Sequence, residues 1–145
     1  MPSNLTQDVT EELFNQAYSA YEEGKLETAL NLLNQIISKN PDMIEAINNR
    51  GLVKSGLDRE AEAIEDYTRA LQIYPEFEMA FVNRGASYLN IGDLQKAIED
   101  FKKALQLNKN SAYTYFYLGD AYGKLGNVEE AIKYFTEAIL SLIHI

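Results

Sequence analysis

A period of 34 residues constrains the fold of this chain more than any other feature. Thr10, Ile44, Glu78 and Ala112 begin four successive segments of that length, and the fourth ends at Ile145. Periods of 20 to 50 residues are typical of proteins built from stacked copies of one small unit, because a single unit cannot bury its apolar face alone. The sequence therefore predicts a leader of residues 1–9 followed by repeats 10–43, 44–77, 78–111 and 112–145.

The four segments share small and large apolar residues at fixed places. The eighth place is always small: Ala17, Gly51, Gly85 and Gly119. The twentieth is always alanine: Ala29, Ala63, Ala97 and Ala131. The twenty-fourth is large and apolar: Leu33, Tyr67, Phe101 and Phe135. Small side chains let two helices approach closely, and a large side chain beside them fills the remaining space.

Each segment contains two apolar patterns at helical spacing, which predicts two helices per segment. The expected first helices are 10–23, 44–56, 78–91 and 112–125, and the second helices are 26–39, 60–73, 94–107 and 128–142. Gly92 and Gly126 suit the end of a first helix, and Pro41 and Pro75 separate one helix pair from the next. In the second segment Gly56 stands two residues early, so we expect that turn to have a different shape.

The period and the pattern of small, alanine, aromatic and proline places resemble the tetratricopeptide repeat over residues 10–145. This resemblance implies an all-α fold, a right-handed α-solenoid of four helix hairpins (an α-α superhelix). It also implies a concave groove lined by the first helix of each hairpin, and binding of a partner's peptide segment or helix in that groove. A protein–protein interaction module, an adaptor or scaffold, is the function that the resemblance predicts.

Composition narrows the choice of partner and compartment. The chain carries 22 acidic and 13 basic residues, a formal net charge of −9, which disfavours nucleic acid and anionic membrane and favours an apolar to basic protein partner. It has no cysteine, no stretch apolar enough to span a bilayer and no secretory signal at its start, so a cytoplasmic location is expected. Neither a phosphate-binding loop nor a catalytic set is present, and a lone His144 has no companion ligands, so we expect no enzyme activity, cofactor or metal.

Arginine and aspartate occur together at two places of the repeat. The seventh place holds Arg50 and Arg84 in the second and third segments, where the twenty-third place holds Asp66 and Asp100. The other two segments have neither residue at these places. We interpret this as an ion pair across each hairpin, for which loss of one partner costs about 3–5 kcal/mol and replacement of both costs little. The alternative is that both arginines face a ligand.

In the family that the chain resembles, certain places of each first helix face the groove, and here they are rich in asparagine and aromatic residues. The sixth place holds asparagine three times, although asparagine is about 0.5–0.7 kcal/mol less favourable than alanine inside a helix. A ladder of carboxamides can hold a peptide main chain, whereas the alternative is a solvated face on which asparagine recurs by chance. The expected groove residues are Asn15, Tyr18, Asn49, Leu52, Val82, Asn83, Tyr113, Phe116 and Tyr117.

Neighbouring hairpins are expected to cover two further residues of this face, Tyr21 and Leu89. In the aromatic run 113–117, Tyr115 takes the buried place, which leaves the aromatic groove residues of the fourth segment outside the core.

The last segment ends on an apolar sequence, although a terminal repeat normally presents a polar outer face. Three explanations are open: the chain is a piece of a longer protein, the tail is altered, or self-association buries the end. The third predicts a homodimer through the C-terminal hairpin, and a self-associating assembly element is the alternative function. The residues expected to mediate self-association are Leu140, Leu142, Ile143 and Ile145.

Overall fold

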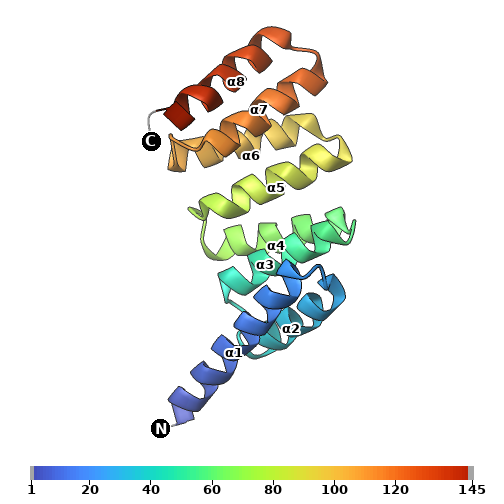
Figure 1. Ribbon diagram of the computed structural model, residues 1–145, viewed down its shortest axis with the longest axis vertical. Helices are drawn as coiled ribbons and strands as arrows, with labels where there is room; N and C mark the ends of the chain where they lie inside the picture. The colour runs from blue at the N-terminus through green and yellow to red at the C-terminus, as the bar shows by residue number, and fades with distance from the viewer. Residues whose placement is uncertain (1, 144–145) are drawn as a thin grey trace. The chain divides into compact units, whose positions relative to one another are not determined.

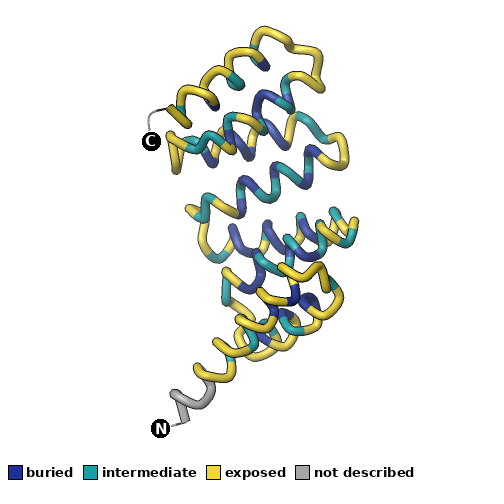
Figure 2. Tube along the Cα trace, viewed as in Figure 1, coloured by how far each residue is buried: buried dark blue, intermediate teal, exposed yellow. Residues whose placement is uncertain are grey.

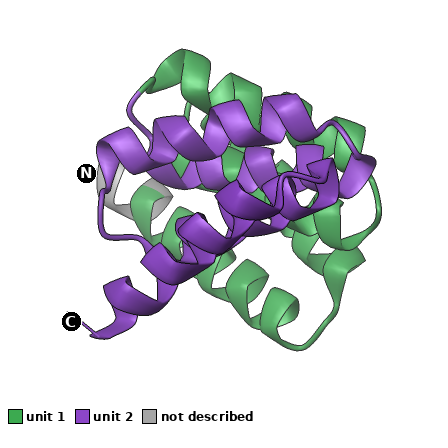
Figure 3. Cartoon of the chain, turned by 90° about the horizontal axis from the view of Figure 1, so that it is seen from above, with its two compact units in different colours: residues 1–75 green, residues 76–145 purple. Residues whose placement is uncertain are grey.

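Eight α-helices account for the secondary structure of residues 2–143, the part of the chain that the computed structural model describes, with side chains described from residue 7 (Figure 1). They form two compact units, residues 1–75 and 76–145 (Figure 3). The first unit contains α1 (Pro2–Glu22), α2 (Leu26–Lys39), α3 (Ile44–Gly56) and α4 (Glu60–Ile73). The second contains α5 (Glu78–Ile91), α6 (Leu94–Leu107), α7 (Ala112–Leu125) and α8 (Val128–Ile143).

Seven of the eight helices begin and end within one residue of their predicted limits, so the predicted hairpin pattern is confirmed. The exception is α1, which was predicted to begin near residue 10 and instead begins at Pro2. No glycine or proline lies between Ser3 and Glu22, so nothing in that sequence interrupts a helix. Residues 2–9 are therefore part of the first helix.

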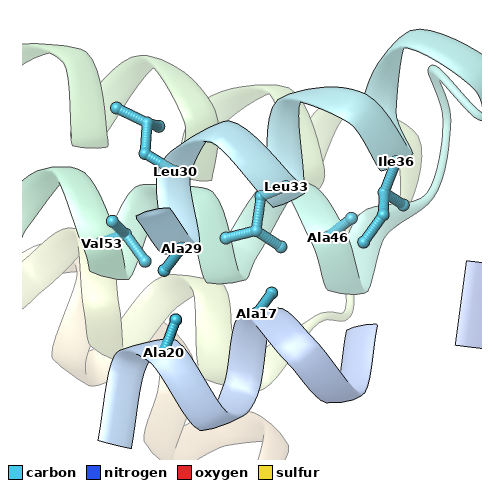
Figure 4. Close-up of a cluster of buried hydrophobic side chains, with 8 residues drawn as sticks. All are labelled: Ala17, Ala20, Ala29, Leu30, Leu33, Ile36, Ala46 and Val53. Atoms are coloured by element: carbon cyan, nitrogen blue, oxygen red, sulfur yellow. The ribbon is translucent and has the colours of Figure 1, made fainter. Parts of the chain in front are cut away.

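Within the first unit, α2 packs against both α1 and α3, and a core of small and branched side chains fills the space between them. Figure 4 shows Ala17 and Ala20 of α1 facing Ala29 and Leu33 of α2. In the second unit α6 lies in the same way between α5 and α7, around the buried ring of Phe101. The predicted role of the small places, to bring helices together, is thus visible in both units.

Three glycines at the eighth place lie directly under an aromatic ring of the same hairpin. A Cβ atom added to them would lie 2.5, 2.7 and 2.6 Å from the nearest ring carbon of the pairs Gly51–Tyr67, Gly85–Phe101 and Gly119–Phe135. Such distances are shorter than real Cβ atoms show, so only glycine fits at these sites while the ring is in place. The first repeat has the alternative combination, Ala17 with the smaller Leu33.

The turns between the two helices of each hairpin share one shape, including the second turn, for which we expected a different one. Each has a residue with positive φ: Gly24 (76°), Asp58 (60°), Gly92 (85°) and Gly126 (88°). In each turn the following backbone N–H donates to a carbonyl five residues earlier, as Arg59 does to Lys54 at 2.8 Å. The expectation about Gly56 was wrong because an aspartate tolerates the left-handed conformation that glycine usually supplies.

Asp58 is the only non-glycine residue with positive φ among those described, and it stores a small strain. We expect Asp58→Gly to raise the free energy of unfolding by about 0.5–1 kcal/mol, because relief of the left-handed penalty exceeds the added entropy of the unfolded chain. Urea unfolding followed by circular dichroism at 222 nm measures this change. The reverse substitution at a matched turn, Gly92→Asp, should lower stability by a similar amount, and a loss of stability in Asp58→Gly would contradict the account.

Candidate functional site

A pocket of about 330 Å³ opens between α1 and α3 in the first unit. Four of the residues predicted for the groove line it: Asn15 and Tyr18 from α1, and Asn49 and Leu52 from α3. The remaining lining residues are Phe14, Ala17, Tyr21, Leu33 and Val53. The pocket lies at the small end of the range for ligand sites in proteins, large enough for one or two bulky side chains.

The floor of this pocket is the core of the unit. Ala17, Leu33 and Val53 are buried core residues whose remaining surface faces the pocket. The wall is aromatic, because Phe14, Tyr18 and Tyr21 follow one another at intervals of four and three residues along one face of α1. Tyr21 was expected to be covered, but its side chain is 41% exposed, since it continues this face by one turn. The expectation for Tyr21 was wrong, and the pocket gains a third aromatic ring.

Asn15 and Asn49 contribute the polar groups of the pocket. Within the described side chains, neither carboxamide is hydrogen-bonded to another part of the chain, and neither is fully buried. Each carboxamide can donate two hydrogen bonds and accept others, which matches the alternating N–H and C=O groups of a peptide backbone. The pocket therefore combines an apolar floor, an aromatic wall and two carboxamides free to bind.

In the second unit the predicted groove residues form a stacked aromatic cluster. The ring of Tyr117 lies parallel to that of Phe101, with centroids 5.2 Å apart, and the Tyr113 and Tyr117 hydroxyls are 3.0 Å apart. Burial, followed by the hydrogen bond to Tyr113, raises the pKa of the Tyr117 phenol above its ordinary value, so it stays neutral. Tyr113 and Phe116 are exposed. The exposed rings of Tyr113 and Phe116 can contact a ligand, whereas the ring of Tyr117 is partly covered because it stacks on the core residue Phe101.

Four other expectations for the second unit have different outcomes. Val82, expected in the groove, is only 8% exposed and belongs to the core around Phe101, because it shares a helix face with the buried Gly85 and Leu89. Leu89 was expected to be covered and is buried, which confirms that expectation.

Asn83 is half-buried and has an interaction within the chain, unlike the two asparagines of the pocket. Tyr115 is half-buried, and the fully buried residue of that run is instead Thr114.

Both pairs of arginine and aspartate come together inside their hairpins. Arg84 donates from Nε and Nη2 to the two carboxylate oxygens of Asp100, each at 2.8 Å. Arg50 makes the same two-bond contact with Asp66, at 2.9 and 2.7 Å. Burial raises the pKa of the Asp100 carboxyl despite the opposing effect of Arg84, and the hydrogen bond to Asp100 raises the pKa of Arg84. The carboxylates of Asp66 and Asp100 therefore bind arginines of their own hairpins.

Sequence reasoning missed one member of the first pair. Lys54 places its Nζ 3.0 Å from Oδ2 of Asp66, so two cations share that carboxylate. The signal was available, because Lys54 follows Arg50 by four residues and therefore lies on the same helix face. In the third repeat the same place holds Tyr88, and among the described side chains the ion-pair partner of Asp100 is Arg84.

The predicted self-association residues that can be described are exposed: Leu140, Leu142 and Ile143. Ile145, and also His144, lie outside the described residues. Nowhere between residues 2 and 143 is there a helix with the length and apolar character needed to cross a bilayer.

Comparison with known proteins identifies the repeats. The tetratricopeptide repeat family matches residues 14–77, 79–111 and 112–140, which together make up most of the chain. No match was found among proteins of curated function.

Solved structures give the same answer for the fold. A crystal structure of MamA is 24% identical, with a TM-score of 0.85, over 99% of this chain and 85% of that one. A structure of MamA from residue 41 to its end, from Desulfovibrio magneticus RS-1, is 18% identical with a TM-score of 0.85, over 93% of this chain and 76% of that one. These likenesses confirm the predicted fold class, an all-α solenoid of helix hairpins.

Proposed function

The chain belongs to the tetratricopeptide repeat family, a family of protein-interaction modules, and from this premise we propose that its first unit binds a peptide segment of a partner protein in the pocket between α1 and α3. The observation that carries the proposal is the combination of an apolar pocket with two unpaired carboxamides, Asn15 and Asn49, at its surface. The apolar part binds a side chain, and the carboxamides bind the main chain beside it.

The size and lining of the pocket define the side chain that it accepts. About 330 Å³ bounded by three aromatic rings, Leu33, Leu52 and Val53 suits a phenylalanine, tryptophan or leucine of the ligand. Tyr18 stands at the edge of the pocket and is mostly exposed, so a bound side chain would cover its ring. Aromatic residues that become covered in this way carry much of the binding energy in protein interfaces.

Charge defines the residues that flank this anchor. Residues 1–75 contain 13 acidic and 6 basic side chains, a formal net charge of −7 out of −9 for the whole chain. A ligand with lysine or arginine near its apolar anchor is therefore attracted to this unit, and its association should weaken with added salt. Binding rather than catalysis is proposed, because the buried carboxylates Asp66 and Asp100 are held by arginine.

Selection from a random peptide library on the purified chain tests the proposal. We expect enriched peptides to share one bulky apolar residue with basic neighbours. Asn49→Ala should weaken a selected peptide about tenfold, since one main-chain contact is lost, and Tyr18→Ala about thirtyfold or more. Fluorescence polarisation with a labelled selected peptide measures both changes.

Asn31→Ala provides the matched control, because Asn31 is exposed on α2 of the same unit and lies outside the pocket. This variant should bind as tightly as the wild type. Failure to enrich any peptide, or equal affinity of Asn49→Ala, Tyr18→Ala and Asn31→Ala for the enriched peptides, would refute binding at this pocket.

A further inference from the structure

An apolar stripe runs along the solvent side of α8. Its members are Val128, Ile132, Ile139 and Ile143, and each of them is at least 60% exposed. In Figure 2 most of α8 is coloured as exposed. The stripe lies on a different side of α8 from Ala131 and Ala138, the buried residues of this helix. Four exposed β-branched residues in one line are unusual for a surface that stays in water.

In the first and third repeats the place of Ile132 is covered by a helix. Ile132 is 60% exposed, whereas its counterparts Leu30 in α2 and Ile98 in α6 are 7% and 6% exposed. The helix that packs on α2 is α3, and the helix that packs on α6 is α7. At Ile132 the α8 stripe therefore coincides with the surface on which a helix packs in these two repeats, and no helix within residues 2–143 covers it.

The first helix of a second copy does not fit this surface. In α7 the residues buried at the third, seventh and tenth places are Thr114, Leu118 and Ala121. The same places of α1 hold Glu12, Gln16 and Ser19, all exposed. Stacking α1 of one copy on α8 of another would bury a glutamate and a glutamine against isoleucine without partners, which is unfavourable. Head-to-tail stacking is therefore less favourable than a contact between two apolar surfaces.

The α8 of a second copy fits, because the stripe reads the same in both directions. The intervals between its four members are four, seven and four residues. When two such helices lie antiparallel, Ile132 of each copy meets Ile139 of the other, and Val128 meets Ile143. An interface of two-fold symmetry requires this kind of self-complementary surface. We propose that the chain forms a two-fold symmetric homodimer through antiparallel pairing of α8 with α8 of a second copy.

Charge and size indicate how strong this dimer is. Residues 76–145 carry 9 acidic and 7 basic side chains, so the ends that meet are close to neutral although the whole chain is at −9. The stripe spans 15 residues of helix, about 22 Å, and a single pair of helices buries less surface than the standard protein interface. The dimer is therefore dissociable, and its population rises with protein concentration.

Sedimentation velocity over a concentration series from micromolar to millimolar chain tests the existence of the dimer. We expect the wild type to shift from monomer to dimer across this range. The double variant Ile132→Glu/Ile139→Glu should remain monomeric throughout, because it places carboxylates at the centre of the contact. Ile91→Glu is the matched control, since Ile91 is also an exposed isoleucine of the second unit but lies on α5, and it should dimerise like the wild type. Circular dichroism verifies that all three remain helical.

Cysteine cross-linking tests the antiparallel arrangement, and it is clean because the chain has no cysteine of its own. Under mild oxidation Ile132→Cys alone and Ile139→Cys alone should give no dimer band, because like positions are seven residues, about 10 Å, apart along the helices. An equimolar mixture of the two variants should give a disulfide-linked dimer of about half the chains or more.

Each other outcome overturns the proposal. If the wild type stays monomeric at the highest concentration, the stripe is not a contact between two copies, and the helix that covers it belongs to a different protein. Dimerisation of Ile132→Glu/Ile139→Glu at the wild-type level places the contact elsewhere. Cross-linking of Ile132→Cys with itself, or species larger than a dimer, shows a parallel or open assembly.

Discussion

Replacing Arg84 with methionine is expected to lower the free energy of unfolding by about 3–5 kcal/mol, as loss of one partner of a buried ion pair does. The cause is the carboxylate that remains. Asp100 is buried, and within the described side chains its hydrogen-bond partner is Arg84, through two bonds of 2.8 Å. Burial already raises the pKa of Asp100, which shows that the loss of water outweighs the attraction of the arginine. Without Arg84 the same burial acts unopposed.

The second repeat supplies a matched comparison for this substitution. Asp66 is paired with Arg50 in the same geometry, but Lys54 lies 3.0 Å from its Oδ2 atom as well. Arg50→Met should therefore cost less, about 2 kcal/mol, because a cation remains beside the carboxylate. Equal losses in Arg50→Met and Arg84→Met would show that Lys54 does not compensate.

The fourth repeat indicates which pair of uncharged side chains can replace the ion pair of Arg84 and Asp100. Its residues at the two places are Leu118 and Tyr134, and Tyr134 lies against Tyr115 and Tyr122. The third repeat has aromatic residues at both flanking places, Phe81 and Tyr88. The double variant Arg84→Leu/Asp100→Tyr should therefore have a free energy of unfolding within about 1 kcal/mol of the wild type.

The pH dependence of stability shows whether the loss in Arg84→Met comes from the buried charge of Asp100 or from lost packing of the arginine side chain. In Arg84→Met the folded-state pKa of Asp100 lies above its unfolded value, so the ionised form is destabilising at neutral pH and the neutral form is not. The difference in stability between Arg84→Met and the wild type should therefore be largest at pH 7 and shrink as the pH falls toward about 4. Guanidinium chloride unfolding at a series of pH values measures this, and a difference independent of pH would assign the loss to packing.

Gly85→Ala is expected to lower the free energy of unfolding by about 2 kcal/mol, although alanine is normally the better helix former by about 1 kcal/mol. The added methyl group would lie 2.7 Å from a ring carbon of Phe101, which is fully buried and cannot move aside without disturbing its neighbours. Overpacking of a tight core then outweighs the gain in helix propensity. Urea unfolding monitored by circular dichroism measures the net change.

The first repeat provides the compensating substitution. It combines Ala17 with Leu33, so Gly85→Ala/Phe101→Leu transfers that pair to the third repeat. We expect the double variant to recover stability to within about 1 kcal/mol of the wild type, while Phe101→Leu alone loses about 1–2 kcal/mol to a cavity. The four proteins form a double-mutant cycle with a stabilising interaction between alanine and leucine. Additive losses would mean that the methyl group and the ring do not collide.

The repeat made an unusual share of the fold predictable from one sequence. Because four segments can be superimposed, each uncertain helix end is observed four times, and seven helices fall within one residue of prediction. The same comparison drew attention to Arg50 with Asp66 and to Arg84 with Asp100, which the structure brings together. The start of α1 was not predictable in this way, because residues 2–9 stand at the places where the other segments have the end of a helix and the turn that follows it.

The candidate site was less predictable, because exposure depends on what packs against a helix face. Asn15, Tyr18, Asn49 and Leu52 were predicted for the groove and line one pocket, but Val82 was predicted on the same grounds and lies in the core. Both outcomes follow from where the neighbouring helix crosses, and a difference of one position in a helix turns a side chain by about 100°.

The sequence by itself determined the repeat length, the positions of the helices and turns, and the residues that permit close approach within each hairpin. These are local or periodic properties, set by backbone propensity and by the size of side chains that recur every 34 residues. Only the tertiary structure decided which polar and aromatic residues stay accessible: it leaves Asn49 unpaired, gives Asn83 a partner, exposes Tyr21 and buries Val82. Accessibility depends on which helices pack against one another. The spacing of residues along a single helix does not specify these contacts.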